Sequence, residues 1–263
     1  DTYGFPLELT QEIAEEQGLT VDLDGFEQAM EEQRQRAKAA AVSIDLTVQG
    51  AIEQVAADQD ATAFKGYEAL EHRSGVRALV VNGEPASTAT AGDAVQIVLD
   101  DTPFYGEGGG QVGDRGVLSG EDLIVVIDSV SRSRDVFIHA GRIERGHLSV
   151  GDSVNAQVDR SCRRRAQANH TATHLLQAAL KQVVDPGIGQ AGSLVDFDRL
   201  RFDFHCPTAV SAEQLERIEV LINGWIAEAH SLVVQEMAID QAKAAGAVAM
   251  FGEKYADVVR VVD

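Results

Sequence analysis

The feature that most constrains the fold of this chain is a series of short, β-branched runs in its middle third. Turn pairs such as Asn82-Gly83 and Gly151-Asp152 separate these runs. A spacing of roughly 8–12 residues between short strands is typical of small barrels and sandwiches. We therefore predict a small β-barrel over residues 73–160. The predicted strands are Val76–Val81, Ala94–Leu99, Leu123–Ile127, Val136–Ile143 and Ser153–Val158.

The residues before this region are predicted to be helical. A helix capped by Asp24 would carry Phe26 on its apolar side and a long polar face as far as Lys38. The stretch Thr47–Ala57 has the same character, and the crowded acidic residues indicate a solvated surface. Residues 1–72 are therefore the first predicted unit.

A third pattern begins near residue 160, where long helical runs alternate with strand-like runs. This alternation predicts an α+β layer domain over residues 161–263, with an antiparallel or mixed sheet. The fold class expected for the whole chain is α+β and multidomain. The predicted elements of this last unit are helices over 169–184, 212–229 and 239–245 and strands over 200–204, 232–237 and 257–262.

The charge balance bears on the class of partner. The 263 residues carry a formal net charge of −20, which argues against a protein that grips phosphates. Salt screens charges beyond roughly 8–10 Å, however, so a local basic patch would suffice. No apolar run approaches the ~20 residues that span a membrane, and no secretory leader pattern is present, so we expect a cytoplasmic protein.

Two further features of the sequence concern its cysteines and its ends. Cys162 and Cys206 are too few for a disulfide framework and are expected to be free thiols. The chain begins without methionine and stops directly after the strand-like run 257–262. Because strands that end a protein leave backbone groups without partners, we expect both ends to lie within a longer protein.

The sharpest chemical motif is His170-Thr171-Ala172-Thr173-His174. Histidines at i and i+4 share one helical face, so both imidazoles can reach one metal ion, and zinc is the natural choice. We expect the two rings side by side near the start of a helix. The alternative is a pair of surface histidines with nothing bound. The residue after His170 is threonine, so the general base of the HExxH metallopeptidases is absent.

The glycine-rich run Thr102–Asp114 is the second motif. Gly108, Gly110 and Gly113 have the spacing of a dinucleotide fingerprint, but turn residues and a strand follow them instead of a helix. We therefore reject nucleotide binding by this loop. A hairpin or bulge remains one interpretation, and a backbone segment held close to a ligand is the other.

The third motif is a cluster of arginines just ahead of the histidines. It is the densest basic cluster in this acidic sequence, and guanidinium groups suit phosphate oxygens. The alternative is a solvated helix start that balances nearby acids. The cluster consists of Arg160, Arg163, Arg164 and Arg165.

Together these motifs resemble one family, the alanyl-tRNA synthetases. The similarity covers essentially the whole chain, in family order. Freestanding editing proteins share the glycine-rich and HxxxH motifs but start near the barrel, so residues 1–72 favour the synthetase. The family's editing domain is similar to HTATHLLQAAL from His170, QAGSLV from Gln190 and FDF from Phe202, and its glycine-rich motif is similar to TPFYGEGGGQVGD from Thr102. The end of its tRNA-recognition region is similar to DTYGFPLELTQEIAEEQGLTVD from Asp1. The segment before its last metal motif is similar to GEKYADVVRVV from Gly252.

The resemblance implies an activity, cofactors and partners. The complete protein would attach alanine to tRNA(Ala) using ATP and Mg bound outside this chain. This part would hydrolyse mischarged Ser-tRNA(Ala) and Gly-tRNA(Ala) at a zinc site. His170 and His174 would supply two of four ligands, and a later Cys-x-x-x-His segment beyond Asp263 would supply the others. Cys206 lies on a different element and does not match.

The resemblance also assigns roles to residues around the metal. Gln190 is the candidate for contacting the serine hydroxyl, because its amide offers a donor and an acceptor. Thr171 and Thr173 rank lower, because positions i+1 and i+3 cannot both share the histidine face. The arginines Arg163, Arg164 and Arg165 would guide the acceptor end by phosphate contact, and Gly108, Gly109 and Gly110 would let the backbone approach the substrate. We expect the run 106–113 to approach the histidine face.

Two alternatives from other classes stay open. Without the later ligands, the chain would be a non-catalytic tRNA-docking module. A freestanding alanyl-tRNA editing deacylase is the other alternative, and a metallopeptidase is disfavoured by Thr171.

Overall fold

The computed structural model describes residues 7–23, 25–30, 32, 46–247 and 257–262. The chain divides into two compact units, residues 1–49 and 50–263. In the first unit, α1 (Leu7–Glu16) ends at Gly18, whose φ of +68° lets the Leu19 N–H donate to the Ala14 carbonyl at 2.8 Å. The predicted Asp24 cap and the helix as far as Lys38 lie outside the described residues, although residues 25–30 are helical.

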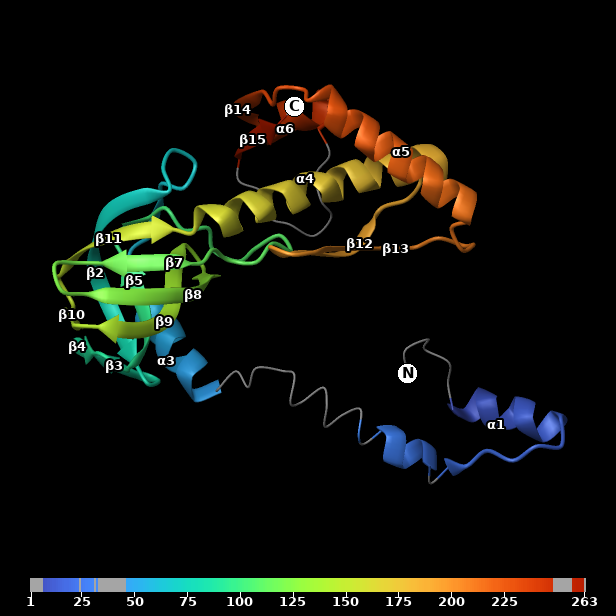
Figure 1. Ribbon diagram of the computed structural model, residues 1–263, viewed down its shortest axis with the longest axis horizontal. Helices are drawn as coiled ribbons and strands as arrows, with labels where there is room; N and C mark the ends of the chain where they lie inside the picture. The colour runs from blue at the N-terminus through green and yellow to red at the C-terminus, as the bar shows by residue number, and fades with distance from the viewer. Residues whose placement is uncertain (1–6, 24, 31, 33–45, 248–256, 263) are drawn as a thin grey trace. The chain divides into compact units, whose positions relative to one another are not determined.

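The middle of the chain is a closed antiparallel barrel, as predicted (Figure 1). Its strands are joined in the order β11-β7-β8-β9-β5-β2, and β11 also pairs with β2, which closes the ring. β5 and β11 have the predicted bounds. β2, β8 and β9 are longer than the predicted strands, and β7 lies in a turn-rich stretch where no strand was predicted. The strands are β2 (Glu71–Val81), β5 (Ala94–Leu99), β7 (Gly116–Ser119), β8 (Ile124–Ser133), β9 (Val136–Arg145) and β11 (Ser153–Val158).

Alternation along the strands gives the barrel two apolar faces. Leu79 and Ile97 point into the barrel core, whereas Val80 and Val98 belong to a second cluster on the outside. The helix α3 (Leu46–Ala57), predicted as Thr47–Ala57, covers this outer cluster with Ile52 and Ala56. Burial on both faces explains why these strands are nearly continuous hydrophobic runs.

The prediction that the chain is helical as far as residue 72 is wrong at its end. β1 (Ala63–Phe64) pairs in parallel with β6 (Asp101–Thr102), and β2 begins at Glu71. The Thr62 hydroxyl donates to the Leu99 carbonyl at 3.4 Å and accepts from the Phe137 N–H at 3.3 Å. These non-local bonds tie residues 62–72 to the barrel. Three short strands complete this region: β3 (Glu84–Ala86), β4 (Thr88–Thr90) and β10 (His147–Ser149).

The long helix α4 (Arg160–Val183) leaves the barrel directly from its closing strand, with only Asp159 between them (Figure 1). The prediction placed its start near Asn169, which is wrong by about two and a half turns. The Asp159 side chain caps the helix by accepting from the Ser161 and Cys162 N–H groups at 2.8 and 3.0 Å. These backbone hydrogen bonds lower the pKa of the Asp159 carboxyl.

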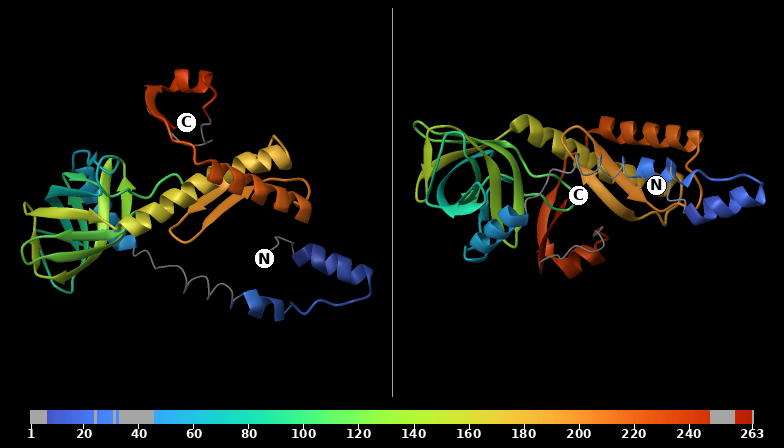
Figure 2. Two further views of the ribbon diagram at one scale, coloured as in Figure 1. Left: turned by 45° about the horizontal axis from the view of Figure 1, so that its top comes forward. Right: turned by 90° about the horizontal axis from the view of Figure 1, so that it is seen from below.

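The second half of α4 packs against a hairpin and another helix (Figure 2). The hairpin strands β12 (Gln190–Val195) and β13 (Leu200–Phe204) are antiparallel, and α5 (Ala212–Glu228) begins with a capping box at Ser211. Ala179, Leu180 and Ile218 are the centre of this small core.

The last elements differ from the single sheet that was predicted. β14 (Val234–Ala238) and β15 (Val258–Val262) form a separate antiparallel pair, with α6 (Ile239–Ala244) between them in sequence. The α+β class is confirmed, but the described strands after residue 160 make two two-stranded sheets. No helix in the described part of the chain is long and apolar enough to cross a membrane.

Candidate functional site

His170 and His174 lie side by side on α4. Their ring centroids are 5.2 Å apart and the ring planes differ by 22°. They lie in the middle of the helix, because α4 starts at Arg160, so the prediction that they lie near a helix start is wrong. His170 is half-buried and His174 is exposed. The stacked arrangement follows from the i, i+4 spacing and presents both rings on one face.

The glycine-rich loop reaches this face through Gln111. The side-chain oxygen of Gln111 lies 2.7 Å from Nδ1 of His170. A carboxamide oxygen can only accept, so Nδ1 carries the hydrogen. The expected approach of the run 106–113 to the histidine helix is therefore present, and a side chain makes the contact.

The loop backbone forms a tight turn that also contacts β12. Gly108 and Gln111 exchange backbone hydrogen bonds of 3.1 and 3.0 Å, and Gly109 and Gly110 between them have φ values of +58° and +79°. A Cβ on Gly110 would lie 2.8 Å from the Ser193 carbonyl oxygen. The glycines thus bring the loop against the hairpin, where only a residue without a side chain fits.

Gln190, predicted to contact substrate, opens the strand that this loop touches. The Val112 N–H donates to the Val195 carbonyl at 3.0 Å, and the Val195 N–H donates to the Gly110 carbonyl at 2.8 Å. Oε1 of Gln190 is buried and has no hydrogen-bond partner among the described residues. An unpaired buried carbonyl is costly, so this oxygen is suited to a donor that the described chain does not supply.

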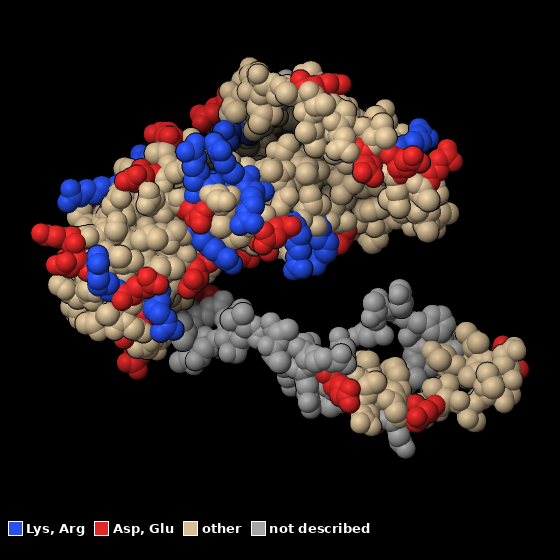
Figure 3. Space-filling model, viewed as in Figure 1, with Lys and Arg blue, Asp and Glu red and all other residues tan. Residues whose placement is uncertain are grey.

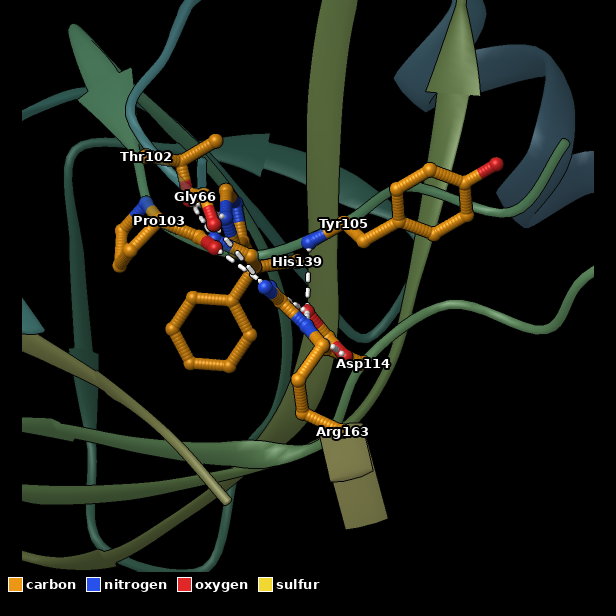
Figure 4. A network of polar contacts seen from close by, with 8 residues as sticks. Gly66, Thr102, Pro103, Tyr105, Asp114, His139 and Arg163 are labelled. Carbon is orange, nitrogen blue, oxygen red and sulfur yellow. Dashed lines mark hydrogen bonds and ion pairs between the residues drawn. The ribbon is translucent and has the colours of Figure 1, made fainter. Parts of the chain in front are cut away.

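Arg163 does not lie where a phosphate-binding residue should (Figure 4). Its side chain, 7% exposed, forms an ion pair with that of Asp114, which is 1% exposed. Nε lies 3.0 Å from both Asp114 oxygens, and the Nη atoms donate to the carbonyls of Gly66 and Pro103 at 3.0 and 2.8 Å. Asp114 also accepts the Tyr105 N–H at 2.7 Å. Arg163 therefore joins α4 to the barrel, which corrects the prediction.

A buried histidine lies next to this ion pair. His139 is fully buried, and its Nδ1–H donates to the Ile97 carbonyl at 3.0 Å while Nε2 accepts from the Thr102 hydroxyl at 2.7 Å (Figure 4). Burial lowers the pKa of His139 from 6.5 to about 4, partly offset by the Ile97 hydrogen bond. The ring is therefore neutral at physiological pH and acts as a polar part of the core.

The other arginines of the cluster lie at the surface. Arg164 is exposed, and Arg165 pairs with Asp198. Lys and Arg side chains gather where the barrel meets the start of α4 (Figure 3). A shallow groove of about 480 Å³ lies beside Arg115 and Arg160 there. This local basic face exists in spite of the strongly negative net charge, and Arg164 remains available to contact a phosphate.

The two threonines of the motif have different environments. Thr171 is exposed, beside the two histidines in sequence. Thr173 is 4% exposed, and its hydroxyl donates to the Asn169 carbonyl at 2.8 Å within the helix. This back-bond occupies the Thr173 hydrogen, so Thr173 is the less suitable of the two for contact with an amino acid.

The donor set at the site fits part of a zinc site. Two neighbouring imidazoles are good zinc ligands, and a hydrogen bond from Nδ1–H to an amide carbonyl is the outer contact that metal-binding histidines commonly make. Among the described residues, no three His, Cys, Asp or Glu side chains lie close enough to hold a metal ion together. His170 and His174 could therefore provide two of the three or four ligands that a zinc site needs.

The sequence interpretation missed Gln111 and Asp114. Both belong to the glycine-rich motif, in which only the glycines were assigned a role. A polar residue directly after a glycine turn was an available signal for Gln111. Nothing local marked Asp114, because its partner Arg163 is 49 residues away.

Comparison with known proteins identifies the family of this chain. The family model of the class II (A) tRNA synthetases matches residues 1–162. The whole chain is 88% identical to an alanine–tRNA ligase of Parasynechococcus marenigrum (strain WH8102), 84% to that of Synechococcus sp. (strain CC9605) and 78% to that of Prochlorococcus marinus (strain MIT 9313). The chain spans about 30% of the length of these relatives. It therefore belongs to the class II (A) tRNA synthetases and, among them, to the alanyl-tRNA synthetase family.

Proposed function

We propose that this region edits the product of an alanine–tRNA ligase by hydrolysing Ser-tRNA(Ala) and Gly-tRNA(Ala). The observation that carries the proposal is that the glycine-rich loop joins the histidine helix to the hairpin. Its Gln111 side chain lies 2.7 Å from Nδ1 of His170 on α4, and its backbone makes hydrogen bonds of 2.8 and 3.0 Å with Val195, at the far end of the strand that opens with Gln190. In the complete protein, a separate site would join alanine to tRNA(Ala) with ATP and Mg.

A second site answers a limit of molecular recognition. A pocket that accepts alanine cannot exclude the smaller glycine, and it rejects an added hydroxyl by a factor of only about 10². A hydrolytic site that recognises the wrong amino acid removes such errors after charging. The exposed Arg164 would contact the phosphates of the acceptor end, with Arg165 released from its surface pair with Asp198.

Zinc, when bound, would polarise the ester carbonyl or activate a water molecule. His170 and His174 would hold it from the same helical face. The ring of His170 is oriented by Gln111. Hydrophobic packing of α4 on the hairpin keeps this face in place.

Gln190 would distinguish serine from alanine. Its buried Oε1 has no donor among the described residues, and the hydroxyl of a seryl ester would supply one. Alanine would leave this oxygen unpaired in a dry site, which costs about 1–3 kcal/mol. Glycine gains nothing from this oxygen, so its hydrolysis depends on the metal and on access alone.

The test is deacylation of Ser-tRNA(Ala) by the complete synthetase. We expect His170→Ala and His174→Ala to abolish hydrolysis, and His147→Ala, at an exposed site in the short strand β10, to leave it unchanged. Full hydrolysis by both histidine variants would show that the editing chemistry resides elsewhere.

A non-catalytic tRNA-docking role is the second candidate, because the described residues hold only two metal ligands. In that case the histidine variants would alter neither hydrolysis nor zinc content, whereas Arg164→Ala would still weaken tRNA binding. Bound zinc per chain after dialysis against a mild chelator separates the candidates further. We expect little retention by this chain and near-stoichiometric retention once a Cys-x-x-x-His segment is present. Full retention by this chain would mean that other residues complete the shell.

A further inference from the structure

We propose that Gln111 is a positioning residue that sets the tautomer of His170. Its side-chain oxygen holds the hydrogen on Nδ1, so the neutral ring carries its lone pair on Nε2. The proposal deepens the editing function, in that His170 matters as a ligand only if that function holds. The contact between Gln111 and His170, and its effect on the tautomer, do not depend on any activity of the protein.

The contact is short and shielded from water. The oxygen of Gln111 lies 2.7 Å from Nδ1, and Gln111 is 7% exposed although it belongs to a loop. Water therefore competes poorly for the Nδ1–H, and the hydrogen bond favours one tautomer over the other. His174, by contrast, is exposed, and no hydrogen bond to a described residue orients its ring.

The backbone around Gln111 explains how a loop side chain is held so firmly. On one side, Gln111 exchanges two backbone hydrogen bonds with Gly108 across the turn. On the other, Val112 donates to Val195 of the hairpin. Gln111 therefore has fixed neighbours in both directions along the chain, and little entropy is lost when its side chain meets the ring.

This geometry gives the glycines a purpose other than the predicted contact with substrate. Gly109 and Gly110 have positive φ values, and Gly110 lies against the Ser193 carbonyl. Both features are needed to turn the chain within two residues and aim Gln111 at α4. The glycines act through Gln111 and His170, so their substitution changes the orientation of the ring.

The chemical consequence follows from how imidazole binds metals. A ligand nitrogen must offer a lone pair, and a hydrogen bond at the opposite nitrogen fixes which one does so and raises its basicity. Loss of such an outer partner commonly lowers metal affinity by about 10–100-fold. Gln111 thus selects Nε2 of His170 as the ligand atom before any metal arrives.

The first experiment needs neither metal nor tRNA. Long-range proton–nitrogen NMR of the ¹⁵N-histidine-labelled chain distinguishes Nδ1–H from Nε2–H rings at a pH well above the ordinary histidine pKa of ~6.5. Signals are assigned with His170→Gln. We expect His170 to be an Nδ1–H ring in the wild type and in Gln111→Glu, which keeps the acceptor. In Gln111→Met, we expect the tautomer ratio to shift by roughly tenfold towards Nε2–H, the size of one hydrogen bond.

His139 supplies the folding control in the same spectrum. Its Nδ1–H donates to Ile97 inside the barrel, so an unchanged His139 signal shows that each variant is folded. A wild-type His170 that carries its hydrogen on Nε2 would overturn the proposal. An Nδ1–H signal that persists in folded Gln111→Met would do the same.

A second measurement separates this proposal from the editing function. In the complete synthetase, zinc affinity should fall about 10–100-fold in Gln111→Met and change by only a few-fold in Gln111→Glu. If the tautomer shifts as expected while His170→Ala leaves deacylation intact, the positioning role stands and the editing proposal fails. Equal zinc affinities in wild type and Gln111→Met would refute the ligand-selecting role.

Discussion

Replacement of Arg163 by methionine should loosen the joint between α4 and the barrel. Methionine keeps much of the side-chain length but removes the cation, which leaves the Asp114 carboxylate, 1% exposed, without its partner. The carbonyls of Gly66 and Pro103 lose their donors as well. Removal of one member of a buried ion pair costs about 3–5 kcal/mol.

This cost is large enough to measure by thermal unfolding. In a domain of 150–250 residues, each kcal/mol lowers Tm by about 2–4 °C, so Arg163→Met should lower Tm by roughly 6–20 °C. The neighbouring exposed Arg164 is the matched control. Arg164→Met should change stability by about 0.5 kcal/mol or less, because its side chain faces solvent.

The double variant tests the cause. Arg163→Met with Asp114→Asn removes the unpaired charge yet keeps a carbonyl oxygen for the Tyr105 N–H, so it should be more stable than Arg163→Met alone. The reasoning would be refuted if Arg163→Met had a normal Tm while the salt dependence of tRNA binding became shallower. That result would assign the guanidinium to a phosphate after all.

Three further predictions concern pH, backbone and specificity. The pKa of His139 is depressed from 6.5 to about 4, so the stability that its neutral ring contributes is complete above pH 6.5 and is lost as the pH falls to 4. This loss should lower the free energy of unfolding by about 3 kcal/mol. Urea titrations at different pH values should show this loss in the wild type and not in His139→Asn. A Cβ on Gly113 would lie 1.9 Å from the Val130 carbonyl oxygen, so Gly113→Ala should lower Tm strongly. A Cβ on Gly189 would have no atom within 4 Å, so Gly189→Ala should leave Tm nearly unchanged. Similar Tm values for the two variants would contradict this reasoning. In the complete synthetase, Gln190→Ala should slow hydrolysis of Ser-tRNA(Ala) more than that of Gly-tRNA(Ala), and equal losses would show that Gln190 supports the site without reading the side chain.

The barrel was predictable because its signals are local. β5 is a largely apolar run and β11 alternates polar with apolar residues; both follow turn residues, and their bounds were predicted to the residue. The first half of β2 was missed, since Glu71 and Arg73 face outwards and weaken the apolar pattern. Only pairing with β11 makes this segment a strand, and that pairing joins residues some 80 positions apart.

The start of α4 was missed for a different reason. Asp159 followed by a helix-compatible run is a capping signal, but the dense arginines of that run also fit a segment that binds phosphate ahead of the helix. The true role of Arg163 depends on Asp114 and on two carbonyls from distant parts of the chain, which no local pattern reveals. The HxxxH spacing, in contrast, carried the histidine geometry by itself, because helical periodicity fixes it.

Because α4 follows the barrel's closing strand directly, a small change in the angle at its start moves the residues farther along the helix by a larger distance. His170 lies ten residues beyond Arg160, or about 15 Å along the axis at 1.5 Å per residue. A tilt of only about 4° at the root would therefore displace the imidazole by about 1 Å, and an error of this size can slow a reaction about 10²-fold. If His170 acts in the proposed editing reaction, substitutions deep in the barrel, far from the histidines, should consequently alter the rate of deacylation before they alter the fold.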